Sequence, residues 1–404
     1  MAVLGARKSI LRPKRHGGEH HRVTFVELFF DLVFVFAVTQ ISHTMVTHLT
    51  PFGAAQAVLM LMAVWWVWIF TSWVTNWVDP DQPPVRLMLF VLMLAGLILS
   101  TSLPRAFGEA GLAFAIAYVV MQVGRSLFML WATRQHHRAN FLNFQRITAW
   151  LILSGLFWIA GGMAEGNIRF VLWLVALLIE FAGPSAGFWT PGLGGSATAD
   201  WAIEGGHMAE RCGLFVIIAL GESVLVTGAT FATLEWTWVN LAAFASAFGG
   251  SVAMWWIYFN IGAEKASHNI SHAADPGRLA RANYTYIHIL LVAGIIVCAV
   301  ADELTLAHPL GHADAAAAAA IVGGPAIYLV GNLLFKWSVY GRPPLSHMVG
   351  LALLGLTIPL GTSIAPLALG AAATAILITV AVWESISLKP SEGGDGVHSH
   401  GVET

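Results

Sequence analysis

Charge and cysteine are both scarce in this sequence. Only 10% of its 404 residues are charged, whereas soluble globular proteins carry about a quarter, so an ordinary soluble domain is excluded. The two cysteines, Cys212 and Cys298, lie in apolar runs, which excludes a disulfide framework and a zinc-type cysteine motif. No glycine-rich phosphate loop, catalytic serine motif or HExxH motif is present. We therefore expect no enzymatic activity, no cofactor and no nucleic-acid partner.

Long apolar segments make up most of the chain, and 57% of its residues are hydrophobic. A helix that spans a membrane needs about 20 apolar residues. Twelve segments meet this requirement: 24–47, 54–78, 85–103, 107–133, 144–163, 168–188, 207–232, 238–262, 283–306, 315–335, 345–363 and 364–386. The sequence therefore predicts an all-α integral membrane protein with about 12 transmembrane helices, in contact with the lipid bilayer.

The second half of the sequence repeats the first. The run 63–68 (AVWWVW) returns at 253–258 (AMWWIY), and 124–128 (GRSLF) returns at 331–335 (GNLLF), in the same order and at similar offsets. This pattern is typical of a tandem duplication. Each half holds six predicted helices, an even number, so both halves enter the membrane from the same side. We expect two parallel six-helix repeats related by an axis along the membrane normal.

Positive charge is distributed unequally between the two sides of the membrane. If the N-terminus is cytoplasmic, the outer segments carry only Arg105 and Arg169, and the other Lys and Arg residues outside the membrane fall on the inner side. This is the positive-inside pattern, and it predicts that both termini are cytoplasmic. The expected division is a basic cytoplasmic segment 1–23, a first repeat 24–188, a connecting loop 189–206, a second repeat 207–386 and a disordered cytoplasmic tail 387–404.

Ionisable residues inside apolar segments are candidates for function, because they are costly in lipid and usually face a protein interior or a watery cavity. Glu27 and Asp31 are four residues apart on the first helix and therefore share a face. His207, Glu210 and Arg211 begin the seventh helix. We interpret all five as candidate substrate- or ion-binding residues. The alternative is structural, since polar side chains also join membrane helices by hydrogen bonds.

Glu222 is a single carboxylate deep in the outer half of the seventh helix. When the two halves are aligned on Glu27 and Glu210, Glu222 takes the position of Thr39. A carboxylate at this depth indicates an ion-binding or substrate-binding role. The alternative is a protonated glutamate that is hydrogen-bonded to a neighbouring helix.

Arg125 and Glu180 are the remaining deep charges, and both are candidate site residues. In the same alignment of the halves, Asp31 becomes Leu214 and Arg125 becomes Asn332, so an acid and a base disappear together. An unpaired charge in a membrane is costly. We therefore predict that Asp31 and Arg125 form an ion pair.

Histidine is frequent, with 16 residues that include the pairs His268/His272 and His308/His312. Metal binding is one interpretation of such i,i+4 pairs. Most of the histidines fall in predicted loops, without cysteine or acidic ligands at a set spacing. We interpret them as solvated loop residues and expect no metal site.

Two motifs resemble those of a known family. One is the run 27–37 (ELFFDLVFVFA), and the other combines 207–215 (HMAERCGLF) with 220–223 (LGES). Both are similar to motifs of the bacterial low temperature requirement A (LtrA) family, and the similarity extends from about Arg22 to Glu384. The resemblance implies a polytopic inner-membrane protein that is linked by name to growth in the cold. It implies no substrate and no catalytic residue.

The first helix is also similar to that of a potassium-channel family with the signature R-x-x-x-F-S-D, which is built on six-helix units. Arg22 and Phe25 lead into Phe30 and Asp31 here. Phe30 stands where the signature has serine, and the second repeat has Leu214 where it has aspartate. In those channels the corresponding helix lines the pore, and the similarity covers this helix alone.

Together these features predict a membrane transport protein. The first hypothesis is a secondary transporter coupled to protons or other cations, in which Asp31 and Glu222 bind the ion and Glu27, Glu210 and Arg125 shape the site. A proton is the expected ion, because a carboxyl group away from water readily holds one. The alternatives are a cation or proton channel, a homodimer with the first and seventh helices lining its pore, and a membrane sensor or enzyme without transport.

Overall fold

The computed structural model describes residues 10–12, 22–134, 138–196, 205–260 and 276–387. Most of the predicted N-terminal segment, residues 197–204 of the predicted loop, and the tail from residue 388 lie outside the described residues. The histidine pair His268/His272 also lies outside them. The described part of the chain contains helices and no named strand.

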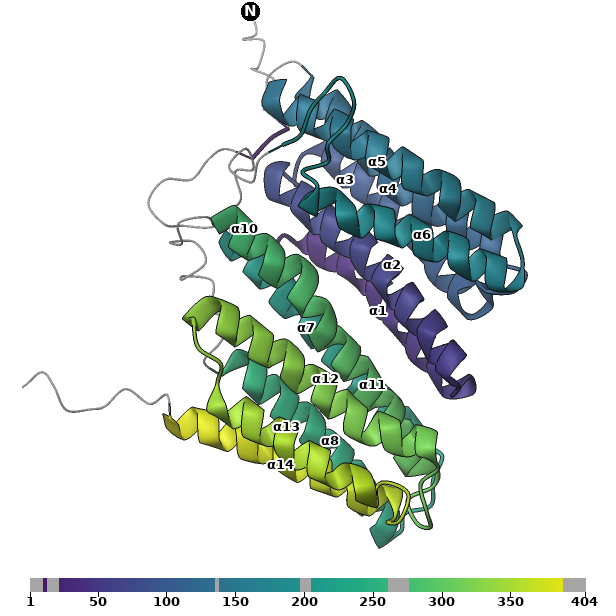
Figure 1. Cartoon of the computed structure of the whole chain (residues 1–404), viewed down its shortest axis with the longest axis vertical. Helices are drawn as coiled ribbons and strands as arrows, with labels where there is room; N and C mark the ends of the chain where they lie inside the picture. The colour runs from purple at the N-terminus through teal and green to yellow at the C-terminus, as the bar shows by residue number, and fades with distance from the viewer. Residues whose placement is uncertain (1–9, 13–21, 135–137, 197–204, 261–275, 388–404) are drawn as a thin grey trace, which may run out of the picture.

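The helices follow one another in two groups (Figure 1). The first group is α1 (Phe25–Thr47), α2 (Pro51–Trp77), α3 (Pro83–Ser102), α4 (Gly111–Thr133), α5 (Arg138–Met163) and α6 (Gly166–Ser185). The second is α7 (Gly205–Ala232), α8 (Trp238–Phe259), α10 (Pro276–Ala280), α11 (His288–Ala307), α12 (Ala315–Tyr340), α13 (Leu345–Thr357) and α14 (Pro366–Ser387). A π-helical segment, η3 (Arg281–Ile287), joins α10 to α11.

Eleven helices in the described ranges are long and apolar enough to cross a membrane, so the chain is an all-α, multi-pass membrane protein, as the sequence predicts. The predicted segment 345–363 forms only a shorter apolar helix, Leu345–Leu360. Its last residues turn into a 3₁₀ helix, Ile358–Leu360, that contains Pro359. Proline has no N–H with which to continue an α-helix, which explains why this segment falls short of the predicted length.

The two groups of helices lie side by side as two bundles (Figure 1). In the first bundle α1 packs on α2 and α3, and α4 packs between α3 and α5. In the second, α7 packs on α8 and α11, and α12 packs against α11 and α13. The two bundles meet where α1 and α2 contact α7 and α11. This junction is where side chains from both halves of the sequence come together.

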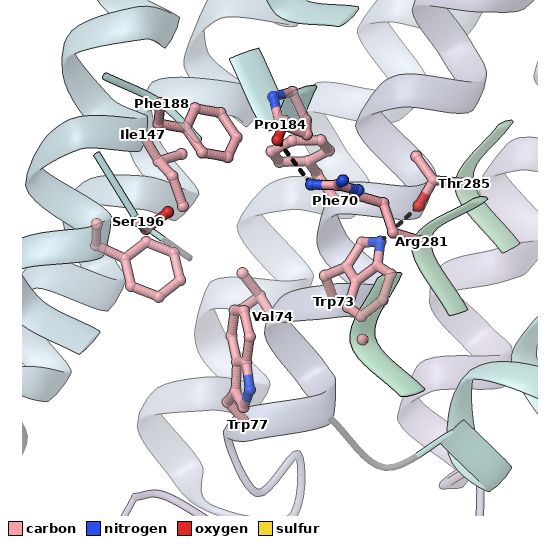
Figure 2. A pocket seen from close by; sticks show the side chains of 12 residues that line it. Phe70, Trp73, Val74, Trp77, Ile147, Pro184, Phe188, Ser196, Arg281 and Thr285 are labelled. Carbon is pink, nitrogen blue, oxygen red and sulfur yellow. Dashed lines mark hydrogen bonds between the residues drawn. The ribbon is translucent and has the colours of Figure 1, made fainter. Parts of the chain in front are cut away.

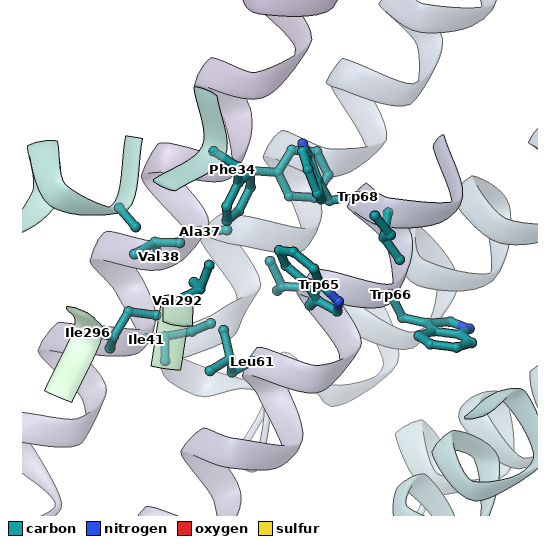
Figure 3. Close-up of a cluster of buried hydrophobic side chains, with 14 of the residues drawn as sticks. Phe34, Ala37, Val38, Ile41, Leu61, Trp65, Trp66, Trp68, Val292 and Ile296 are labelled. Atoms are coloured by element: carbon teal, nitrogen blue, oxygen red, sulfur yellow. The ribbon is translucent and has the colours of Figure 1, made fainter. Parts of the chain in front are cut away.

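Aromatic side chains fill the junction between the bundles (Figure 3). Trp65, Trp68 and Phe34 are buried together, and the Trp68 ring lies 4.3 Å from that of Phe215 on α7. The Trp65 indole donates to the backbone carbonyl of Thr285 at 2.7 Å. Aromatic rings bury a large apolar area, and a buried indole N–H needs an acceptor. The aromatic cluster therefore joins α2 to both α7 and η3, the segment that precedes α11.

Glycine brings α11 and α12 unusually close. A Cβ at Gly294 would lie 2.5 Å from the backbone nitrogen of Tyr328, and one at Gly324 would lie 2.8 Å from that of Cys298. Such distances are far below van der Waals contact, so only glycine fits at both crossings. Small residues permit this kind of backbone approach between membrane helices. The close packing sets the distance between polar groups on the two helices.

Candidate functional site

The start of α1 carries a buried carboxylate with partners from three segments. Glu27 is fully buried and accepts hydrogen bonds of 2.9 Å from both the backbone N–H and the hydroxyl of Thr24. Arg211 Nη1 and His207 Nε2 each lie 3.1 Å from its Oε1. Arg12 Nη2 lies 3.3 Å from its Oε2. A carboxylate with this many donors is held in its charged form and in one orientation.

Asp31, one helical turn further along α1, shares the same arginine. Arg211 Nη2 donates to Asp31 Oδ1 at 2.6 Å, and the Trp68 indole donates to that oxygen at 2.7 Å. Asp31 Oδ2 is buried and has no hydrogen-bond partner. Arg211 therefore bridges the two acids of α1 from α7. We call Arg12, Glu27, Asp31, His207 and Arg211 the junction network.

The predicted ion pair between Asp31 and Arg125 is wrong. Arg125 is buried on α4, where it donates to the carbonyl of Val67 at 3.1 Å and to the hydroxyl of Thr71 at 2.9 Å, as well as to Gln122. The physical reason is that α1 faces the other half of the chain at this level. The counter-charge of Asp31 comes from across the junction and not from its own half.

Glu180 belongs to a second polar cluster, inside the first bundle. Its Oε2 accepts from Tyr118 at 2.7 Å and Gln122 at 2.9 Å, and its Oε1 accepts from Ser154 at 2.7 Å and Trp158 at 2.9 Å. Gln122 in turn accepts from Arg125, so the deep acid and base of this bundle are joined through one amide. Four neutral donors from α4 and α5 satisfy the carboxylate. The geometry fits a structural role.

Glu222 lies in a third place, on the part of α7 that is remote from the junction network. One of its carboxylate oxygens accepts from the hydroxyl of Thr39 on α1, and the other is buried without a partner. Ser42, three residues beyond Thr39, also has a buried hydroxyl without a partner. The outer parts of α1 and α7 therefore meet through polar oxygens that are only partly satisfied.

Glu210 lies beside the junction network. It accepts from the backbone N–H of Val23 at 3.2 Å and is partly exposed. The structure thus brings Glu27, Asp31, His207 and Arg211 together, with Glu210 adjacent. Of the other candidates, Arg125 and Glu180 form their own cluster, and Glu222 stands apart.

Sequence reasoning missed two polar residues inside the second bundle, one buried and one half-buried. Lys336 counts as a loop charge in the sequence, but it is buried on α12, where its Nζ lies 2.6 and 2.7 Å from the two carboxylate oxygens of Glu384. Asp302 lies within α11 and accepts from Ser223 at 3.4 Å. The signal for both was their place near the end of an apolar segment, where a charge is usually assigned to the membrane surface.

Two clefts open between the bundles at opposite ends. Figure 2 shows the cleft at the end where α1 begins, with a volume of about 60 Å³ and a wall that includes Trp73, Phe188 and Arg281. Arg281 Nη1 donates there to the carbonyl of Pro184 at 2.7 Å. At the other end, α1, α2, α11 and α12 enclose a cleft of about 570 Å³ that is mostly apolar.

The aromatic cluster separates the two clefts. Ile41, Leu61 and Ile296 belong to the cluster drawn in Figure 3 and line the larger cleft. On the other side, Trp65 is hydrogen-bonded to the backbone of Thr285, which lines the smaller cleft. Ile41 lies on α1, which also carries Glu27 and Asp31 of the junction network and the Thr39 that contacts Glu222.

Comparison with known proteins adds the following. A family model described as bacterial low temperature requirement A protein (LtrA) matches residues 22–382. An uncharacterized protein of Rhizobium meliloti (strain 1021) is 43% identical over 380 residues, which cover 93% of this chain and 92% of that protein. Both motifs from which the sequence resemblance was drawn lie within the matched range. The predicted resemblance is confirmed.

Proposed function

The chain belongs to the family of bacterial low temperature requirement A proteins, and from this premise we propose that it is a secondary transporter of the bacterial inner membrane, coupled to protons or other cations. Its small solute or ion crosses between the two bundles, with both termini in the cytoplasm. The proposal assigns ion binding to Asp31 and Glu222, as the sequence predicts. Glu27, His207 and Arg211 position Asp31.

The observation that carries the proposal is the burial of the junction network between the two halves. Glu27, Asp31 and Arg211 are each completely or almost completely buried, in helices that are apolar enough to span a membrane. Charges at membrane depth are rare and mark ion paths and proton relays. A network that links the halves also couples its state of charge to their relative position.

The unpartnered oxygen of Asp31 supplies a chemical step. A proton that binds at Asp31 Oδ2 neutralises the carboxylate, and Arg211 then keeps only Glu27 as a charged partner. This weakens the 2.6 Å contact between α1 and α7, because a hydrogen bond between two charged groups is stronger than one with a neutral acceptor. Binding and release of the proton would thereby change how firmly the bundles hold together.

Two further features support alternating access. The two clefts lie at opposite ends of the junction and share no lining residue, and a carrier with alternating access needs such separate openings. The order of helix contacts is also similar in both bundles, since α1 packs on α2 and α3 as α7 packs on α8 and α11. We propose two parallel six-helix repeats on this basis, with α13 as the shortest of twelve helices. Rocking of one repeat against the other is the usual motion of such transporters.

A cation or proton channel is the second candidate. The direct contact between Thr39 on α1 and Glu222 on α7 favours it, because these two helices are the expected pore lining of such a channel, here in a homodimer. Saturable flux of a solute against its own gradient distinguishes the transporter from the channel. A channel carries its ion only down the gradient.

Flux in proteoliposomes tests both candidates. We expect pH-dependent proton or cation flux with the native chain, and its loss in Asp31→Asn and in Glu222→Gln. Glu109→Gln is the control, because Glu109 is exposed and pairs with Arg105 at the surface. Absence of flux under every imposed gradient, with folded protein in the vesicles, would reject transport. Normal flux in both acid variants would reject the assigned ion sites.

A further inference from the structure

A small cavity lies inside the second bundle, away from the junction. Residues of α8, α11, α12 and α14 line it, and its volume is about 30 Å³, which gives room for about two water-sized particles. Most of the wall consists of small side chains. Four oxygen-bearing side chains also face it: Asp302 and Thr305 from α11, Ser246 from α8 and Thr374 from α14.

Asp302 is the charged residue of this wall. One of its oxygens accepts from Ser223 at 3.4 Å, and the ion pairs formed among the described residues include none with Asp302. Glu27 and Glu384 each contact a cationic side chain, and four neutral donors satisfy Glu180, whereas Asp302 has this one long hydrogen bond. A carboxylate in a membrane helix without a counter-charge is costly. A cation bound in the cavity would offset this cost, and so would a proton on the carboxyl group.

The hydroxyl groups of the cavity are arranged as acceptors. Thr305 donates its hydrogen to the carbonyl of Ala301 at 2.7 Å, and Thr374 donates its hydrogen to the carbonyl of Ser246 at 3.2 Å. With both hydrogens used on the backbone, the lone pairs of the Thr305 oxygen remain for a ligand, and the Thr374 oxygen keeps one, because it also accepts from the Ser246 hydroxyl at 3.5 Å. Oxygen lone pairs attract a cation and repel an anion.

A proline adds a backbone oxygen to the same cavity. Pro325 lies inside α12 and lines the cavity together with Ile321. Because proline has no N–H, the carbonyl of the residue four positions earlier, Ile321, loses its helical donor. Freed backbone carbonyls in interrupted membrane helices are known to coordinate cations. Ile321 on α12 and Asp302 on α11 line the same cavity, near the point where the two helices approach closely at Gly324.

We propose that this cavity is a binding site for a monovalent metal cation, Na⁺, held by the Asp302 carboxylate, the hydroxyls of Thr305 and Thr374, and the freed carbonyl of Ile321. One carboxylate among neutral oxygens balances a single positive charge, and hard cations prefer oxygen ligands. The site lies in the second bundle and shares no residue with the junction network. The inference therefore goes beyond the proposed transport function, since binding is measurable without flux.

The test uses the full chain purified in detergent. Its melting temperature is compared in NaCl, KCl and N-methyl-D-glucamine chloride at equal ionic strength, and binding of radioactive ²²Na⁺ gives the affinity. We expect Na⁺ to raise the melting temperature, because a ligand that binds only the folded state stabilises it. Asp302→Asn should abolish both the shift and ²²Na⁺ binding. Thr305→Val should weaken binding about tenfold, the loss expected for one ligand worth ~1.4 kcal/mol.

Two matched variants serve as controls. Asp81→Asn removes an exposed aspartate that pairs with Arg86, and Thr101→Val removes an exposed hydroxyl that donates to a helical carbonyl, as Thr305 does. Both should keep the Na⁺ response.

Three outcomes would overturn the proposal. The first is an equal shift in all three salts, and the second is a Na⁺ response that survives Asp302→Asn. The third is stabilisation by acid alone, which would mean that Asp302 holds a proton. If Asp302→Asn does not fold, Thr305→Val and Thr374→Val decide by the affinity for ²²Na⁺, and unchanged affinity in both rejects the site. If the native chain binds ²²Na⁺ but shows no flux in proteoliposomes, the transport proposal is refuted and the Na⁺ site stands.

Discussion

The bridge that Arg211 makes between Glu27 and Asp31 predicts a strong and specific thermodynamic coupling across the junction. Arg211 donates to Glu27 at 3.1 Å and to Asp31 at 2.6 Å, with all three side chains buried. Hydrogen bonds to charged groups contribute about 1.5–3 kcal/mol each, and loss of one partner of a buried pair costs about 3–5 kcal/mol. We therefore expect Arg211→Gln to lower the free energy of unfolding by about 3–5 kcal/mol.

Asp31→Asn should cost less, about 1–3 kcal/mol, because Arg211 keeps Glu27 as its partner. The double variant Asp31→Asn/Arg211→Gln should lower the free energy of unfolding by at least about 1 kcal/mol less than the sum of the two single variants. The reason is that the second change removes a charge that the first left unpaired. Equilibrium unfolding in mixed micelles measures the three values. The control is a second double-mutant cycle that combines Asp31→Asn with Arg125→Gln, two residues that make no direct contact.

If the unfolding free-energy changes of Asp31→Asn and Arg211→Gln add to within about 0.5 kcal/mol in the double variant, the two residues are not coupled and the bridge is refuted. It would also fail if the cycle with Arg125 showed the larger coupling, because that result would restore the pairing within one half.

The remaining predictions concern packing and a second ion pair in the second bundle. Gly324→Ala should lower the free energy of unfolding by about 1–3 kcal/mol, and with it the melting temperature. The reason is that the added Cβ would overlap the backbone of α11. Gly323→Ala, where nothing lies within 4 Å, should stabilise by about 0.5–1 kcal/mol; equal effects of the two would contradict the packing. Lys336→Met should destabilise by about 3–5 kcal/mol, because it leaves Glu384 buried and unpaired. Adding Glu384→Gln should recover most of that loss in the same unfolding assay, and no recovery would count against the pair.

The all-α membrane class was predictable because the length of a spanning helix is fixed by the thickness of the bilayer. Apolar runs of about 20 residues are visible without any knowledge of tertiary contacts. The prediction fell short at α13, where the run 345–363 includes Pro359. A hydropathy scale counts that proline as one more apolar residue. In the structure the α-helix ends just before it, because proline has no backbone N–H to donate.

Four residues of the junction network were also predictable, but Arg12 and the partner of Asp31 were not. Burial cost alone singles out Glu27, Asp31, His207 and Arg211. The predicted partner of Asp31 was Arg125, because the second half has uncharged residues at both corresponding positions. Such a comparison finds only partners within the same half. The real partner, Arg211, comes from the other half, and only the packing of α1 against α7 reveals it.

Asp302 and Lys336 were missed for a different reason. Both stand close to the end of an apolar run, at a depth where a charged side chain usually reaches water. In the structure Lys336 is buried because it pairs with Glu384. Asp302 is half-buried and lines a cavity within the second bundle. Depth along a helix is readable from sequence, but the face that a residue presents depends on neighbours that are distant in sequence.

The bridge across the junction also has a consequence for biosynthesis. Asp31 and Arg211 are separated by 180 residues, and a ribosome that adds about 5–20 residues per second needs about 9 to 36 s to cover that distance. Of the two hydrogen-bond partners that the structure describes for Asp31, Trp68 is synthesised before this interval ends and Arg211 only at its end. Arrival of α7 supplies the missing charge. A chain that stops before α7 therefore keeps an Asp31 carboxylate without its Arg211 partner, which distinguishes it from a finished molecule.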